Sequence, residues 1–244
     1  MVADPVVLTR VADDVWIDTE PVRILGMRLT ASMAIVRMAG SGEPGKNGLL
    51  LYSPLSFTPE RRAAVEALGR VEHLYAPNLF HHLYVGDWAI AFPSARLHAP
   101  PGLSKKRPDL RVDRVHGEAP DPAFADVFDE VRIEGFRLEE AVLVHRPSRT
   151  LLVADLVHNV GRPKHAWAKI YTKAMGFHDR VALSRMIRST GFTDKAAARR
   201  SVEKLLALSF GRIVVGHGSP VETDARQQLA NACRFLGITE DHAA

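Results

Sequence analysis

Three short stretches of the sequence place possible metal-ligating side chains directly after apolar runs. His81 and His82 end the stretch NLFHH, Asp155 follows TLLVA, and His217 lies in RIVVGHG. Such apolar runs predict buried strands, and a side chain just after a strand stands at the mouth of the sheet on a rigid support. Imidazole and carboxylate groups are ligands for zinc and iron, and a carboxylate can bridge two ions. The sequence therefore indicates one shared site.

Each of these residues also has a purely structural interpretation. Asp155 can cap the turn or helix that follows it, and His217 can be a hydrogen-bonded residue in a Gly-His-Gly corner. His81 and His82 can mark the entry to a helix, with one ring packed and the other solvated. Because every position follows a predicted strand, a shared site explains them together better than three separate roles do.

The segments that position these residues alternate between strand and helix patterns. In chain order they are β-rich to residue 54, helical from Thr58 to Gly69, β-rich to residue 159, helical from Trp167 to about Ser209, a strand in RIVVGHG, and a last helix from Thr223 or Asp224 to Leu236. Thr58 before Pro59 is a typical helix start. This order predicts an α/β protein with two β-sheets and helices outside them, in a single domain over residues 1–244.

The order of these motifs resembles the metallo-β-lactamase fold, an αββα sandwich of two mixed β-sheets with helices outside. TLLVADLVHN resembles the strand whose terminal Asp, here Asp155, bridges two metal ions in that superfamily. RIVVGHG resembles the strand and corner that supply its last histidine, here His217. More narrowly, NLFHH, HRPSRTLLVADLVHN and VVGHG resemble the DUF4336 family, and that resemblance covers most of residues 6–237.

The sequence also departs from the superfamily pattern. The His-x-His-x-Asp-His signature is absent: if His82 matches its final histidine, then His81 stands in place of the Asp, and Pro77 and Leu79 stand in place of the first two histidines. Gly135-Phe136 stands where a further Gly-His ligand is expected. The Asp of that signature commonly holds or deprotonates the attacking water, so its replacement bears directly on catalysis.

The remaining candidates define the expected site. We expect His82, Asp155 and His217 to hold one metal ion, with His81 as a fourth ligand or a proton shuttle, and His81 and Asp155 as the catalytic pair. Zinc is the first expectation, iron and manganese are alternatives, and a metal-free site with acid–base histidines is another. The sequence does not assign roles to Glu140, His145 or His158.

These residues support more than one function. The first is metal-dependent hydrolysis of a small-molecule substrate. The second is a protein of the same fold that has lost catalysis and acts as a ligand-binding or interaction module, as the missing signature residues suggest. Redox chemistry at a carboxylate-histidine iron site ranks last, because the chain shows no flavin-binding segment.

The composition limits the classes of binding partner and the cellular location that we expect. The 244 residues carry a net charge of +4, and the densest basic groups, at 105–107 and 199–200, lack interleaved aromatics, so we expect no nucleic-acid partner. No apolar run is long enough to span a membrane, and no signal peptide is apparent, so we expect no membrane partner. The single cysteine, Cys233, cannot form an intrachain disulfide, which favours a reducing, cytoplasmic location. The oligomeric state is left open.

Overall fold

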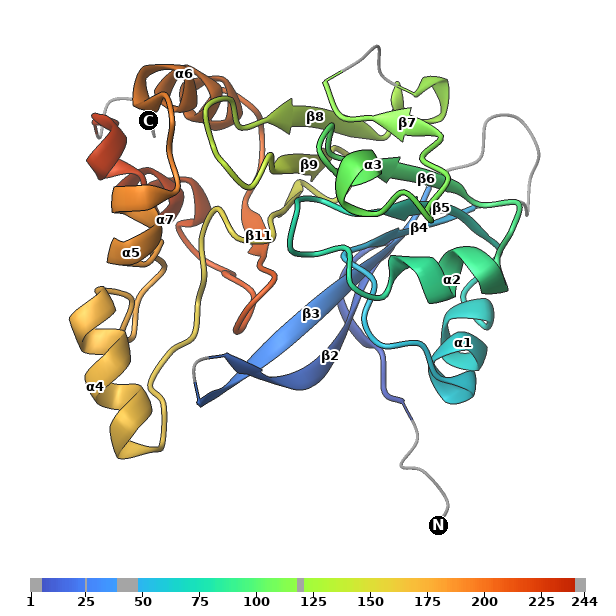
Figure 1. Ribbon diagram of the computed structural model, residues 1–244, viewed down its shortest axis with the longest axis horizontal. Helices are drawn as coiled ribbons and strands as arrows, with labels where there is room; N and C mark the ends of the chain where they lie inside the picture. Colours follow the sequence, from blue (N-terminus) through green and yellow to red (C-terminus); the bar gives the residue numbers. More distant parts are fainter. Residues whose placement is uncertain (1–5, 25, 39–47, 118–120, 240–244) are drawn as a thin grey trace.

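The strands of the computed structural model form two β-sheets (Figure 1), and the structure describes residues 6–24, 26–38, 48–117 and 121–239. The first sheet has seven strands in chain order: β1 (Thr9–Ala12), β2 (Val15–Ile24), β3 (Met27–Arg37), β4 (Leu49–Tyr52), β5 (Val71–Tyr75), β6 (Arg96–Ala99) and β7 (Arg114–Val115). The second sheet has four strands in the order β11 (Arg212–Val214), β10 (Thr150–Leu152), β9 (Ala141–His145) and β8 (Phe128–Arg132).

Helices lie on the outer faces of the two sheets and along the cavity edge of the sandwich. They are α1 (Pro59–Glu66), α2 (Val85–Ala91), α3 (Leu103–Lys106), α4 (Ala166–Met175), α5 (Arg185–Thr190), α6 (Lys195–Leu206) and α7 (Ala225–Ala232), with short 3₁₀ turns at Pro122–Phe124 and Arg234–Leu236. Figure 1 shows α1 and α2 beside the first sheet and α6 and α7 beyond the second. None of the helices in the described ranges has the length and apolar character needed to cross a membrane.

The hydrophobic cores define the layers. One core joins α1 and α2 to the outer face of the first sheet, around Trp88 and Leu51. A second lies between the two sheets, where Val36 of β3 and Leu152 of β10 belong to the same cluster. A third joins the second sheet to α6 and α7, around Val202 and Ile213. The result is an αββα sandwich of mixed sheets, as the sequence predicted.

Strand direction brings several strand ends to one edge. β1 to β4 pair antiparallel, β4 to β7 pair parallel, and β10 pairs parallel with β11. Leu49, Leu50 and Leu51 of β4 are fully buried because both faces of that strand are covered, which explains why the strand lacks an alternating pattern. Segments that leave β5, β10 and β11 carry the candidate ligands.

The local expectations are largely confirmed. Thr58 caps α1 by accepting a hydrogen bond from the Arg61 backbone N–H, and Asp194 caps α6 in the same way. The last helix is shorter than expected: α7 ends at Ala232, and the chain continues as a 3₁₀ turn to Leu236. Gly237, at φ 86°, ends this turn in the left-handed region, where glycine carries no steric penalty.

Candidate metal centre

His81, Asp155 and His217 converge at one edge of the sandwich. His81 lies in the segment between β5 and α2, Asp155 follows β10, and His217 follows β11. Each offers one ligand atom, and these atoms lie within 4.8 Å of one another. His81 Nε2 is 3.4 Å from Asp155 Oδ2, and His217 Nε2 is 3.7 Å from Asp155 Oδ1, so the carboxylate faces one ring with each oxygen. The three side chains are almost fully buried.

The far side of each ring is held by a hydrogen bond. His217 Nδ1 lies 3.2 Å from the Thr30 carbonyl oxygen, which can only accept, so Nδ1 carries the proton. In the neutral ring, Nε2 is then a bare acceptor that faces a carboxylate oxygen. His81 Nδ1 lies 2.7 Å from Ser53 Oγ, an arrangement that allows the same tautomer. His217 Nε2 and Asp155 Oδ1 are thus two acceptors 3.7 Å apart, an arrangement that favours a proton or a cation between them.

This donor set fits a divalent metal ion. Two imidazole nitrogens and one carboxylate are a common set of three protein ligands at catalytic zinc sites, and hydrogen bonds at Nδ1 are the usual support of such ligands. When no metal is bound, a proton on His81 can occupy the same place. Burial acts to lower the pKa of His81, but the Asp155 and Glu140 carboxylates outweigh it and raise that pKa.

The neighbouring groups respond to the same charges. Burial alone would raise the pKa of Asp155, but the surrounding histidines, His81 first among them, hold it well below its usual range. Burial lowers the pKa of His217 despite the nearby carboxylate. The carboxylate is therefore ionised at neutral pH and His217 is neutral, which are the states in which both groups bind metal.

A buried carboxylate, Glu140, fixes the turn that carries Asp155. Its Oε1 accepts the backbone N–H groups of Ala154 (2.9 Å) and Leu156 (3.2 Å), and its Oε2 accepts that of Asp155 (2.8 Å). Asn78 Nδ2 donates to Glu140 Oε2 (3.0 Å) and to Asp155 Oδ2 (2.9 Å). Burial and the charge of Asp155 raise the pKa of Glu140 to about 7. Apart from the proximity of Glu140 to Asp155 along the chain, nothing in the sequence indicated this role.

Asn78 also shapes the loop that presents His81. Its Oδ1 accepts the backbone N–H groups of Phe80 (2.8 Å) and His81 (2.9 Å), which closes an Asx-type turn. The same fully buried side chain therefore bonds both the His81 loop and the Asp155 carboxylate. The Pro-Asn pair marked this position as a turn in the sequence, but nothing in the sequence indicated that Asn78 reaches Asp155.

Two positions with unusual backbone requirements border the site. Ser53 has φ 57°, a left-handed conformation that costs a non-glycine residue free energy, and this conformation places its hydroxyl on His81. Gly216 packs against both other segments: a Cβ there would lie 2.7 Å from the Ala154 carbonyl oxygen and 2.9 Å from His81 Cε1. Only glycine permits this approach.

His82 lies outside the group of three, although the match to the family signature favoured it over His81. Both of its ring nitrogens are buried without a hydrogen-bond partner in the described structure, and burial beside Lys106 lowers its pKa. The two rings separate because neighbouring residues in a tight turn point in different directions. The remaining signature positions, Pro77 and Leu79, carry no ligand, and Phe136 packs in the core against Phe192.

His158 is a further histidine at the site. Its ring centroid lies 5.5 Å from that of His217, and its buried Nδ1 has no hydrogen-bond partner in the described structure. Burial lowers the pKa of His158 to about 4. His145, by contrast, lies at the end of β9 and bonds Ser148 Oγ through Nδ1 (2.7 Å), so it belongs to the 145–150 turn.

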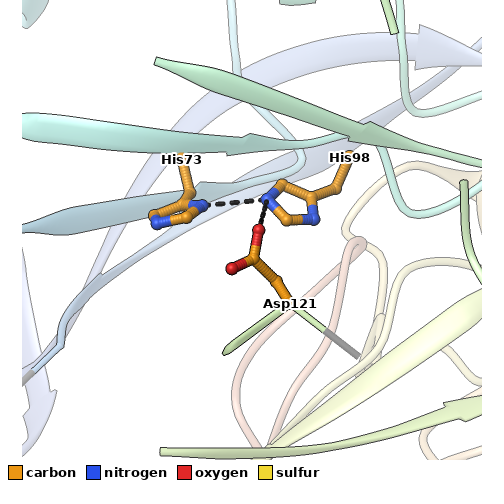
Figure 2. Close-up of side chains that lie close together, drawn as sticks. All are labelled: His73, His98 and Asp121. Carbon is orange, nitrogen blue, oxygen red and sulfur yellow. Dashed lines mark hydrogen bonds and ion pairs between the residues drawn. The ribbon is translucent and has the colours of Figure 1, made fainter. Parts of the chain in front are cut away.

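A second histidine-carboxylate group lies away from this site. His73 Nδ1 is 2.9 Å from His98 Nε2, which is 4.0 Å from Asp121 Oδ2 (Figure 2). Arg96 and Arg114 lie 3.1 and 3.6 Å from the same Asp121 oxygen. Two guanidinium groups neutralise this carboxylate and repel a divalent cation, so we assign the group to packing between the sheets rather than to metal binding.

A cavity of about 520 Å³ opens over His81, Asp155 and His217. Its walls come from the β2–β3 hairpin, from residues 80–84, and from residues 171–187. A volume of this size is typical of small-molecule sites. The candidate ligands therefore lie where a bound substrate could reach them.

Comparison with known proteins identifies the fold. No protein-family model and no curated protein sequence matches the chain. Among solved structures, a metallo-β-lactamase from Pontibacter korlensis is 14% identical, with 96% of this chain and 100% of that chain covered and a TM-score of 0.63. VMB-1 is also 14% identical, with 99% and 100% covered and a TM-score of 0.65. The flavodiiron core of Flv1 from Synechocystis sp. PCC6803 is 13% identical, with 96% and 61% covered and a TM-score of 0.67. The chain has the metallo-β-lactamase fold.

Proposed function

We propose that this protein is a metal-dependent hydrolase of the DUF4336 type. It binds one divalent ion, with zinc as the first candidate, through His81, Asp155 and His217. One observation carries the proposal: the tautomer of His217 is fixed by Thr30, so its Nε2 faces the Asp155 carboxylate as a bare acceptor. The arrangement supports one ion rather than two, because the described residues bring only these three ligand atoms together at this edge. Iron and manganese accept the same ligands.

The residues around the proposed ion have different roles in hydrolysis. A bound divalent ion supplies Lewis acidity, which polarises a carbonyl and acidifies water. Asp155 is held in its ionised state and faces both histidines. Thr30 fixes the tautomer of His217, and Ser53 bonds Nδ1 of His81. His81 serves as a ligand where the superfamily signature has an Asp. His158 lies beside His217, but burial lowers its pKa to about 4, so it is a weak base at neutral pH.

Metal analysis of untagged protein tests the proposal. We expect close to one equivalent of metal per chain by elemental mass spectrometry, and loss of most of it in His217→Ala and Asp155→Ala. His82→Ala is the matched control, because His82 is an equally buried histidine one residue from His81 but outside the group. Metal content that survives both site changes, or that falls only in His82→Ala, would overturn the assignment. Circular dichroism establishes that each variant folds.

A binding module without catalysis is the second candidate. The replacement of the signature Asp by His81 favours it, as does the large cavity above the site. Metal-loaded protein that binds a ligand in the cavity but leaves a panel of esters, lactones and amides intact would favour this second candidate.

A further inference from the structure

The β2–β3 hairpin presents an apolar wall to the cavity. Val22 pairs with Leu29 and Ile24 pairs with Met27, so these side chains lie on one face of the hairpin, and each of them lines the cavity. The hairpin extends beyond β4, which pairs only with residues 34–37 of β3 (Figure 1). Thr30 in this extension accepts the hydrogen bond from His217 Nδ1, whereas the outer part of the hairpin contributes apolar side chains to the cavity.

The opposite wall is apolar as well. One side is lined by Tyr171 of α4, by Met186 of α5 and by Phe177 between these helices. Another side is lined by Phe80 and Leu83. Leu83 is 68% exposed and Phe80 58% exposed, although both are large hydrophobic side chains. Solvent-exposed apolar groups that gather around a cavity mark a binding site rather than a core.

Three polar side chains in the walls away from the candidate ligands already have partners. Glu20 bonds Arg61, Ser184 accepts a backbone N–H, and Lys106 donates to a backbone carbonyl at 2.6 Å. These side chains offer little to a polar ligand. The histidines and Asp155 concentrate the reactive polar groups at one end, and the rest of the cavity offers apolar contact.

The charges of the lining disfavour a cationic ligand. Arg23 and Lys106 are the lining residues with a permanent positive charge, whereas Glu20 is paired with Arg61 and Asp155 faces two histidines. A neutral or anionic apolar molecule is complementary to this distribution.

We propose that the cavity binds an apolar acyl group, and that the substrates are carboxylic esters of medium-length apolar acids. The assignment of the ester bond as the reacting group depends on the proposed hydrolase function, whereas the assignment of the acyl group does not. In the reaction, the oxygen of water bonds to the acyl carbon, the bond from that carbon to the alcohol oxygen breaks, and a proton from the water passes to the alcohol. The products are the carboxylic acid and the alcohol.

Direct binding tests the acyl assignment without catalysis. Titration calorimetry of chelator-treated protein should show saturable binding of octanoate, much weaker binding of acetate, and little binding of octylamine. Leu83→Ser should weaken octanoate binding about fivefold, because the apolar contact of one side chain is lost. Ile90→Ser is the matched control: Ile90 is 82% exposed but lies outside the cavity, so binding should not change.

Val22→Thr is a second variant that replaces one methyl group of the wall by a hydroxyl of similar size. It should weaken octanoate binding while its circular dichroism spectrum stays unchanged. Equal effects of Leu83→Ser and Ile90→Ser, or equal binding of octanoate and octylamine, would overturn the acyl assignment. A comparison of the rates at which metal-loaded protein hydrolyses p-nitrophenyl octanoate and p-nitrophenyl acetate tests the two proposals together. We expect the octanoate ester to be hydrolysed faster. Octanoate binding without turnover contradicts the hydrolase alone, and turnover with no chain-length preference contradicts the acyl assignment alone.

Discussion

Asn78 Nδ2 lies 2.9 Å from Asp155 Oδ2, although the two residues are separated by 77 positions in the chain. The same amide bonds Glu140, and its oxygen holds the His81 loop. One buried side chain thus links the loops that carry two of the three candidate ligands. The relative positions of His81 and Asp155 depend on this network.

Ser53 should control metal affinity through His81. Ser53→Ala removes the hydrogen bond to His81 Nδ1 and should weaken metal binding about tenfold, measured by competition with a chromophoric chelator. Ser53→Gly removes the same hydroxyl but suits φ 57°. It should lose the same affinity and be about 1 kcal/mol more stable than Ser53→Ala. Unchanged affinity in both variants would show that Ser53 does not orient the ring.

Glu140→Gln should destabilise the fold. The amide group of Gln places N–H donors against a backbone N–H that Glu140 now accepts, so we expect a loss of about 1–3 kcal/mol in the free energy of unfolding by urea. Glu134→Gln changes an exposed glutamate paired with Arg132 and should cost less than about 0.5 kcal/mol. Similar losses in the two variants would contradict a specific role for Glu140.

Gly216→Ala should damage the site through crowding. The added methyl group meets the Ala154 backbone and the His81 ring, so we expect metal content to fall and the melting temperature to drop. Gly211→Ala is the control. Gly211 lies just before β11, at the opposite end of the strand from Gly216, and a Cβ there would meet nothing within 4 Å. The idea fails if Gly216→Ala retains full metal content.

Acid should unfold the protein partly through the second histidine group. Burial lowers the pKa of His73 to about 4 and of His98 to about 3, whereas both titrate near 6.5 when unfolded. The unfolded chain therefore binds more protons between these values, and the free energy of unfolding falls as pH drops from about 6.5 to 4. In chelator-treated protein, His98→Gln should flatten this dependence in urea titrations. An unchanged slope would assign acid sensitivity to other groups.

Much of the site could be predicted from the sequence because it depends on strand ends. Asp155 and His217 follow apolar runs, and such runs become buried strands whose ends meet at one edge of a sandwich. The helix caps at Thr58 and Asp194 are equally local, since each depends on a side chain and a backbone group a few residues away. The two-sheet architecture followed from the order of strand and helix patterns.

The choice between His81 and His82 could not be made from the sequence, because it depends on how one turn packs. Asn78 fixes that turn, and Ser53 and Gly216 receive the His81 ring from two other segments. Glu140, Asn78 and the apolar wall of the hairpin act through contacts between residues far apart in the chain. The sequence by itself determined which residue types stand at the sheet edge, and tertiary packing decided which of them face one another.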